Sequence, residues 1–484
     1  MKRLVFAPVL ALSACMVGPN YHKPALDLPA AYKTAPGWVR AAPSDAAPKG
    51  DWWTGFNDPT LNALEPQVAV NNATVKADYD AYEEAAELVR EAQGGLFPTL
   101  GLTGSATRAG AGGGSSSGSS SGGFSAGPRT SGTFEGSASW VPDIWGKIRR
   151  QIQENSANAQ VSAADFANAA LSAQAALAVD YVDLRTTDAS IALYRQTVAA
   201  DQRSLHITEN QAAAGTAAPA DVITARTQLE GAQSALIAAG AVRAQYEHAI
   251  AVLTGQMPEN FSLAPAAQIP SVPAPPVSLP STLLERRPDI AAAERSMAAQ
   301  NAAIGVAVGA YYPDLTLSAL GGYSADPIGG LFSVSNALWS LGADASGTLF
   351  EGGERAATVS AADYAYDEAV QNYRATVLAA FQNVEDDLSN LQIYAAQAQV
   401  QAQAVADAQR ATQIALNEYE AGTESYTSVV TAQVTLLQDQ QSLLAIQQER
   451  LLAAVALYQD MGGGFSARNL PSAAQLQAGL PFAP

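Results

Sequence analysis

Cysteine is nearly absent from this chain of 484 residues: Cys15 is the only one, so no disulfide can form within one chain. The cysteine follows a segment of signal character, in which two basic residues precede the apolar run Leu4–Leu12. The sequence Leu12-Ser13-Ala14-Cys15 matches a lipobox, where the thiol takes a diacylglyceryl group. We predict a lipoprotein signal peptide over residues 1–14 and lipid attachment at Cys15. An ordinary secretory signal followed by an incidental cysteine is the alternative.

Long apolar runs and an excess of basic charge are also absent. No segment after the signal has the roughly 18 uninterrupted apolar residues of a spanning helix, so no transmembrane helix is predicted. The net charge of -19 makes nucleic acid an unsuitable partner, because nucleic-acid binding needs a basic face. An acidic chain is compatible with a periplasmic protein or with a conduit that favours cations.

Proline and glycine are absent from two long stretches, Lys147–Ala213 and Glu354–Ala421. At about 1.5 Å per residue, the first would form a helix of roughly 100 Å, which is typical of a coiled-coil-like rod. After each stretch we expect the chain to turn and a second helix to return. In the last helix apolar residues recur every seven positions, a spacing that keeps one seam facing a neighbour, at Val430, Leu437, Leu444, Leu451 and Tyr458. A simple antiparallel hairpin with a broad buried face is the alternative.

The chain is predicted to be one unit written twice. Three glycines recur 207 residues later in similar contexts: Gly146, Gly215 and Gly255 correspond to Gly353, Gly422 and Gly462. Repeated units usually bury their faces against each other. The first copy is longer by eight residues, in an interval that holds the Gly/Ser-rich stretch Gly110–Gly123, which we expect to be a loop between strands.

Each copy also contains two runs in which apolar and small polar residues alternate, at about 98–143 and about 313–350. A period of two over about ten residues is typical of membrane-barrel strands, with an ordinary exposed hairpin as the alternative. Four strands cannot close a barrel, and open edges are not tolerated in lipid, so several protomers would have to pool their strands. Two protomers would supply eight strands and three would supply twelve.

These signals divide the chain into six segments. Each copy is expected to hold a helix (Leu61 to about Gly94 in the first), a strand pair and a long helical hairpin whose tip lies near 215 or 422. The segments are the signal peptide 1–14, a lipid-anchored extended segment 15–58, the first copy 59–255, a proline-rich connector 256–280, the second copy 281–462 and a tail 463–484.

Residues that could carry chemistry are scarce. The three histidines have no metal-type spacing, and no phosphate-binding loop or nucleophile motif is present. We therefore predict no enzyme activity, no metal and no cofactor other than the covalent lipid. Asp180 and Asp387 correspond across the 207-residue offset. They could form an acidic belt inside a tube that favours cations, with a solvated helix face as the alternative.

Four motifs together resemble the outer-membrane efflux protein family, the TolC-like exit ducts, and most closely its NodT-type lipoprotein branch, the outer-membrane factors of RND pumps. The resemblance covers nearly the whole mature chain. The motifs are Cys15-Met-Val-Gly-Pro-Asn-Tyr-His-Lys-Pro24, Leu284-Glu-Arg-Arg-Pro-Asp-Ile-Ala-Ala-Ala-Glu-Arg295, the stretch Asn301–Leu317 and Leu349-Phe-Glu-Gly-Gly353.

The resemblance implies a mainly helical protomer with a membrane β-barrel portion. Three protomers would form a twelve-stranded barrel in the outer membrane, continued by a twelve-helix tube in the periplasm. A periplasmic adaptor protein and an inner-membrane RND pump would be its partners. The adaptor would contact the helix tips at Gly215, Thr216, Gly422 and Thr423.

The family often has an acidic gate residue in a Leu-Asp-Ala-Gln element just past the second tip. Here that element is Val430-Thr431-Ala432-Gln433, so Thr431 stands at the gate position, and Asp221 is the candidate in the first copy. A solvated carboxylate at a helix start is the alternative for Asp221.

We interpret the chain as a passive outer-membrane duct, lipid-anchored and extending into the periplasm, for the efflux of small toxic compounds. A type I secretion conduit and a non-channel periplasmic scaffold lipoprotein are the alternatives.

Overall fold

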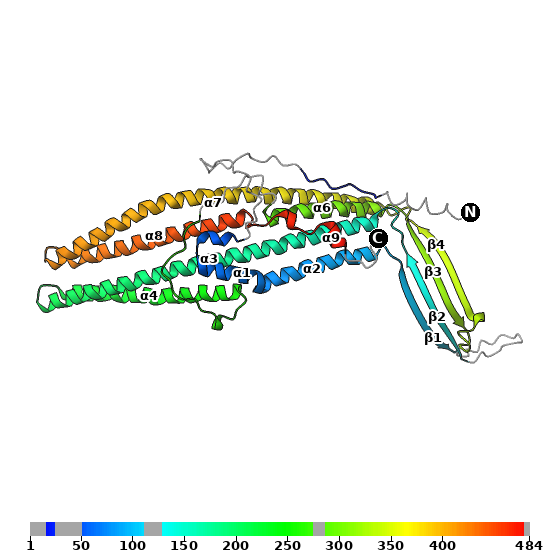
Figure 1. Cartoon of the computed structure of the whole chain (residues 1–484), viewed down its shortest axis with the longest axis horizontal. Coiled ribbons are helices and arrows are strands. Elements are labelled where there is room, and N and C mark those ends of the chain that lie inside the picture. The colour runs from blue at the N-terminus through cyan, green and yellow to red at the C-terminus, as the bar shows by residue number, and fades with distance from the viewer. Residues whose placement is uncertain (1–15, 25–50, 111–127, 274–285, 479–484) are drawn as a thin grey trace.

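The computed structural model describes residues 16–24, 51–110, 128–273 and 286–478. A long body of helices carries a four-stranded sheet at one end (Figure 1). The mainly helical character predicted from the sequence is confirmed. The helices are α1 Pro59–Asn71, α2 Ala73–Gly94, α3 Lys147–Ala213, α4 Pro219–Leu253, α6 Pro288–Gly309, α7 Glu354–Glu420, α8 Tyr426–Asp460 and α9 Ala473–Gln477, with 3-10 turns at Trp52–Phe56, Pro258–Asn260, Val334–Asn336 and Ala467–Asn469. The strands are β1 Thr99–Ala109, β2 Arg129–Trp140, β3 Asp314–Ala325 and β4 Ala337–Ser346.

The long helices occur in two pairs of equal length. Helices α3 and α7 each have 67 residues, and α4 and α8 each have 35. At the tips between them, Gly215 and Gly422 have φ of 77° and 76°. Glycine adopts this left-handed conformation without steric penalty, so it can end one helix and let the chain reverse into the next.

The prediction of a single helix from Leu61 to about Gly94 is wrong in one respect, because the structure has two helices there, α1 and α2. Asn72 between them is extended, with ψ of 128°, and its Oδ1 accepts hydrogen bonds from the backbone N–H groups of Thr74 and Val75. Its Nδ2 donates to the carbonyl of Leu253 at 3.1 Å. The break occurs because the asparagine side chain caps α2 in place of continuing the helical ladder.

The sheet is antiparallel throughout, in the order β1-β2-β3-β4. Strands β2 and β3 join the two halves of the chain, with Gly132 opposite Ala325 and Trp140 opposite Leu317. Strands β1 and β4 lie at the edges, and among the described residues each pairs with one other strand. Among the residues described, no helix combines the length and the apolar character needed to cross a membrane.

The largest hydrophobic core lies midway along the helical body, where Trp52 and Phe56 pack against Leu177, Tyr181 and Leu451. From there the two helical hairpins extend away from the sheet (Figure 1). Glutamines of α8 hydrogen-bond to α3 at three levels and so hold the hairpins side by side: Gln448 to Asp183 at 2.7 Å, Gln441 to Tyr194 at 2.8 Å and Gln433 to Ser204 at 3.1 Å.

Candidate functional site

The two hairpin tips lie at the end of the molecule opposite the sheet (Figure 1) and are closed by the same hydrogen bonds. The Thr216 backbone N–H and hydroxyl donate to the carbonyl of Gln211 at 2.9 and 3.0 Å. The Thr423 backbone N–H and hydroxyl donate to the carbonyl of Glu418 at 2.9 and 3.0 Å. Each threonine satisfies a carbonyl that the helix end would otherwise leave without a partner. The Gly-Thr pairs predicted at the tips therefore have one shared geometry.

A cavity of about 420 Å³ lies between the tips and is lined by both of them. Three carboxylates contribute to its lining, those of Asp221, Glu420 and Glu424. Of the two candidate gate residues, the structure brings only Asp221 into this cavity. Thr431 is exposed on α8, and its hydroxyl donates to the carbonyl of Thr427 at 2.8 Å. The cavity can attract cationic groups, because its charged lining residues are all carboxylates.

Two buried tyrosines also line the tip cavity, and sequence reasoning did not single them out. The rings of Tyr419 and Tyr426 are 5.3 Å apart at 55°, and both side chains are buried. Burial, followed by the nearby carboxylate of Asp201, raises the pKa of Tyr426 to about 12. The tyrosines lie on either side of Gly422 in the sequence, and this position was the signal from which they could have been identified. They join the end of α7 to the start of α8 with an apolar contact.

Asp180 and Asp387 have different surroundings, although the offset makes them equivalent. Asp180 on α3 is partly buried, and burial, with a smaller contribution from Asp183, raises its pKa to about 6. Asp387 on α7 is only 9% exposed. Burial and then the neighbouring carboxylate of Asp460 raise its pKa, and Arg287 partly offsets this.

The expectation of an acidic belt therefore does not fit Asp387. Its carboxyl lies inside the protomer beside Asp460 rather than on an open face. Leu253, 207 residues before Asp460, provides no such carboxyl beside Asp180. Burial disfavours the charged form of Asp387, which weakens any attraction for cations.

A second buried ionic cluster, centred on Asp188, was not predicted from the sequence. Asp188 on α3 accepts hydrogen bonds from Arg185 at 3.1 Å and from Arg243 of α4 at 2.7 Å. It also accepts from the backbone N–H of Ala266 at 3.0 Å, while Arg243 donates to the carbonyl of Leu263 at 2.7 Å. The bonded partners offset the cost of burying these charges, so the cluster fastens the segment after α4 to the helical body.

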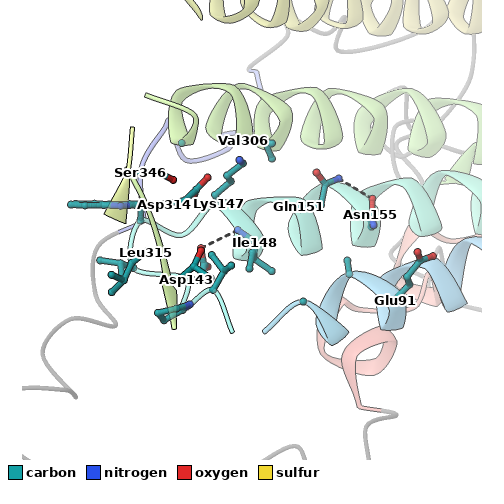
Figure 2. A pocket seen from close by; sticks show the side chains of 18 of the residues that line it. Glu91, Asp143, Lys147, Ile148, Gln151, Asn155, Val306, Asp314, Leu315 and Ser346 are labelled. Carbon is teal, nitrogen blue, oxygen red and sulfur yellow. Dashed lines mark hydrogen bonds between the residues drawn. The ribbon is translucent and has the colours of Figure 1, made fainter. Parts of the chain in front are cut away.

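A cavity of about 670 Å³ lies where the strands meet the helices (Figure 2). Asp143 at its edge accepts from the backbone N–H groups of Ile148 and Arg149, each at 3.0 Å, and so caps the start of α3. Figure 2 shows Gln151 donating to Asn155, with Glu91 on the facing helix α2. None of the predicted site residues lines this cavity.

Groups that could hold a metal ion are not found: no three His, Cys, Asp or Glu side chains cluster suitably in the part of the chain that the structure describes. Cys15, the predicted lipid attachment site, lies outside the described residues. The signal peptide and most of the Gly/Ser-rich stretch also lie outside them.

Comparison with known proteins agrees with this architecture. The family model described as "Outer membrane efflux protein" matches residues 64–256 and 279–463. The toluene efflux pump outer membrane protein TtgI of Pseudomonas putida is 30% identical over 480 residues, covering 96% of this chain and 98% of the relative. The structure of the outer-membrane channel OprN is 27% identical with a TM-score of 0.82, covering 93% and 99%. The CmeC outer membrane channel of Campylobacter jejuni has the same fold, at 22% identity and a TM-score of 0.83, covering 96% and 98%.

Proposed function

This chain belongs to the outer membrane efflux protein family, and from that premise we propose that it forms the exit duct of a tripartite RND-type efflux system. In this role it carries small toxic compounds passively across the outer membrane and periplasm. The observation that carries the proposal is the arrangement of the protomer, with a sheet at one end and two matched hairpin tips at the other (Figure 1). A protomer of this form spans two environments, a lipid layer for the strands and an aqueous space for the helices.

A trimer is the proposed assembly. Strands β1 and β4 are edges within the chain, and lipid does not tolerate open edges, so β4 of one protomer pairs with β1 of the next. Three protomers supply twelve strands to a closed barrel and, from α3, α4, α7 and α8, twelve helices to a tube. Exposed apolar side chains on α4 and α7, such as Ile237 and Leu378, support contacts between neighbouring protomers.

The two halves of the protomer are proposed to be structural copies. Equal helix lengths support this, and so does the match of the family model to two separate segments that begin at 64 and 279. Each copy then supplies two strands and one hairpin to a ring that neither could close alone. The matched tips at Gly215 and Gly422 follow from this duplication.

The proposed partners are a periplasmic adaptor at the tips and, beyond it, an inner-membrane RND pump. The cavity between the tips supports this, because residues of both hairpins line it and its charged groups are carboxylates, which suit a basic side chain of a partner. The proposed lipid on Cys15 and the strands together attach the duct to the outer membrane. Energy for transport then comes from the pump.

Two measurements test the function. Purified protein in planar bilayers should give single channels of reproducible conductance, and protein that inserts without forming pores would favour a non-channel scaffold. Deleting the gene should sensitise the host to small toxic compounds while protein secretion stays unchanged. Lost secretion with unchanged tolerance would favour a type I secretion conduit instead.

A further inference from the structure

The first described segment, residues 16–24, lies along the helical body from the end that carries the sheet (Figure 1). The backbone N–H of Val17 donates to the carbonyl of Trp145 at 3.1 Å, one residue before Gly146, the N-cap of α3. This contact places the segment at the junction between the strands and helices. We call residues 16–21 the terminal strap.

Arg150 on α3 directs most of its hydrogen bonds to this strap. Its Nε donates to the carbonyl of Val17 at 2.9 Å, and its Nη2 donates to the carbonyl of Gly18 at 2.9 Å and to Oδ1 of Asn20 at 3.2 Å. Its Nη1 donates to Gln153 of the same helix at 3.0 Å. Arg150 is only 2% exposed. A buried guanidinium needs bonded partners, and here the strap supplies most of them.

Three glycines let the strap approach α3 and α6 closely. Gly18 has φ of 88°, and a Cβ there would lie 2.5 Å from the Cα of Gly305 on α6. A Cβ on Gly305 would in turn lie 2.7 Å from Cδ of Arg150. A Cβ on Gly146, whose φ is 79°, would lie 2.6 Å from Cγ of Met16. The surface is therefore shaped to this stretch of the chain's own backbone.

The far end of the strap is held by α6. The hydroxyl of Tyr21 donates to Oε1 of Glu294 at 2.5 Å, and the guanidinium of Arg295 lies 5.9 Å from the centre of the Tyr21 ring. Three sequence motifs thus meet at one place: the stretch after Cys15, the motif that ends at Arg295 and the stretch Asn301–Leu317.

We propose that Arg150, Glu294 and Gly305 form a socket that binds the terminal strap of the same chain and holds Met16 at the strand–helix junction. Met16, which directly follows Cys15 in the sequence, lies against Gly146. The socket sets where the lipid leaves the helical body and, with it, the depth of that body below the membrane. This consequence for the membrane rests on the proposed lipid at Cys15, whereas binding of the strap does not. Arg150 is the positioning residue.

Hydrogen exchange followed by mass spectrometry on the full mature protein in detergent tests the socket. Arg150→Met should speed exchange in the peptide that covers 16–24 by at least about tenfold, because several charge-assisted bonds are lost. Arg149→Met is the matched control, since its guanidinium lies on the same turn and pairs with Asp143 at 3.0 Å. Equal exchange in both variants and wild type would overturn the proposal.

Gly18→Ala is a second variant that tests the socket if Arg150→Met fails to fold, because it changes only a residue of the strap. It should speed exchange in the same peptide while circular dichroism reports unchanged helix content, and unchanged exchange would again overturn the proposal. The mass of the N-terminal peptide from the same samples reports the acyl chains. If the strap is protected from exchange but the chain carries no acyl groups, only the lipid proposal is wrong. If the chain is acylated but neither substitution changes exchange in the strap, only the socket proposal is wrong.

Discussion

Arg287, at the start of α6, pairs with Asp460, the last residue of α8, with 2.6 Å between Nη1 and Oδ1. The same guanidinium pairs with Asp289 at 2.7 Å. Asp387 of α7 lies beside this pair, so one arginine faces carboxyls from three helices. The contact ties the second hairpin to the short helix that leads toward the sheet.

Arg287→Met should lower the free energy of unfolding by about 3 kcal/mol, because it leaves several largely buried carboxyls without their cation. Urea denaturation followed by circular dichroism measures the change. Arg410→Met is the control, since the Arg410–Asp407 pair is exposed and surface pairs contribute about 0–1 kcal/mol. Equal losses in the two variants would contradict the assigned role of Arg287.

Glu65 should make the stability depend on pH. Its side chain is 0% exposed, neither carboxyl oxygen has a hydrogen-bond partner among the described residues, and burial raises its pKa to about 9. The folded state therefore retains a proton that the unfolded chain releases above about pH 4.3. The contribution of Glu65 is full below that pH and is lost as the pH rises toward 9.

Glu65→Gln removes this dependence. The unfolding free energy of the variant relative to wild type should rise with pH, by up to about 1.4 kcal/mol per unit between roughly pH 5 and 8. Thermal or urea unfolding at several pH values measures the difference. A difference that stays constant across this range would show that Glu65 is ionised in the folded protein.

Ion selectivity should depend on the carboxylate of Asp221 at the tip and hardly at all on the buried carboxyl of Asp387. Asp221→Asn removes a charge from the cavity between the tips and should lower the preference for cations in planar bilayers, measured as the reversal potential in a salt gradient. Asp387→Asn is the internal comparison and should change the reversal potential little, because this side chain is buried in the protomer. The opposite ranking of the two variants would restore the acidic belt at Asp387.

Gly422→Ala should strain the second tip without a steric clash. No atom lies within 4 Å of the position that the new Cβ would take, but φ of 76° is unfavourable for alanine by about 1–2 kcal/mol. The tip should become more mobile, and cross-linking to an adaptor there should weaken. Ala421→Gly provides a control, because Ala421 has an ordinary right-handed conformation with φ of -77°. Undiminished cross-linking in Gly422→Ala would mean that the tip geometry does not matter for docking.

Much of the helical architecture could be predicted because it depends on local rules. The absence of proline and glycine from Lys147 to Ala213 predicts an unbroken helix, and α3 covers those residues. Glycines mark the turns because the left-handed conformation there suits no other residue as well. The break at Asn72 has a local cause that the sequence reading missed, the capping of α2 by the asparagine side chain, whereas the bond from Asn72 to Leu253, 181 positions away, could not be predicted.

The candidate sites were predicted less well, since their chemistry depends on neighbours distant in sequence. The tips were found because Gly-Thr recurs there, and Asp221 was named as a gate candidate, but the tyrosine pair and the other two carboxylates of the tip cavity, Glu420 and Glu424, were not. Asp180 and Asp387 looked alike because the 207-residue offset relates them, yet only Asp387 has a carboxyl of α8 beside it.

The sequence by itself indicated, through its motifs, the family to which the chain belongs, and it determined the lengths of α3 and α7 and the places where the chain reverses. These features rest on backbone hydrogen bonds and torsions within a few residues of one another. Only the tertiary structure decided which charged groups are buried and what they hold, as with Arg150 and the strap residues that it bonds, which lie 130 to 133 positions before it. Burial and long-range pairing set the energy of a charge, and neither can be read from the residues adjacent to it in the chain.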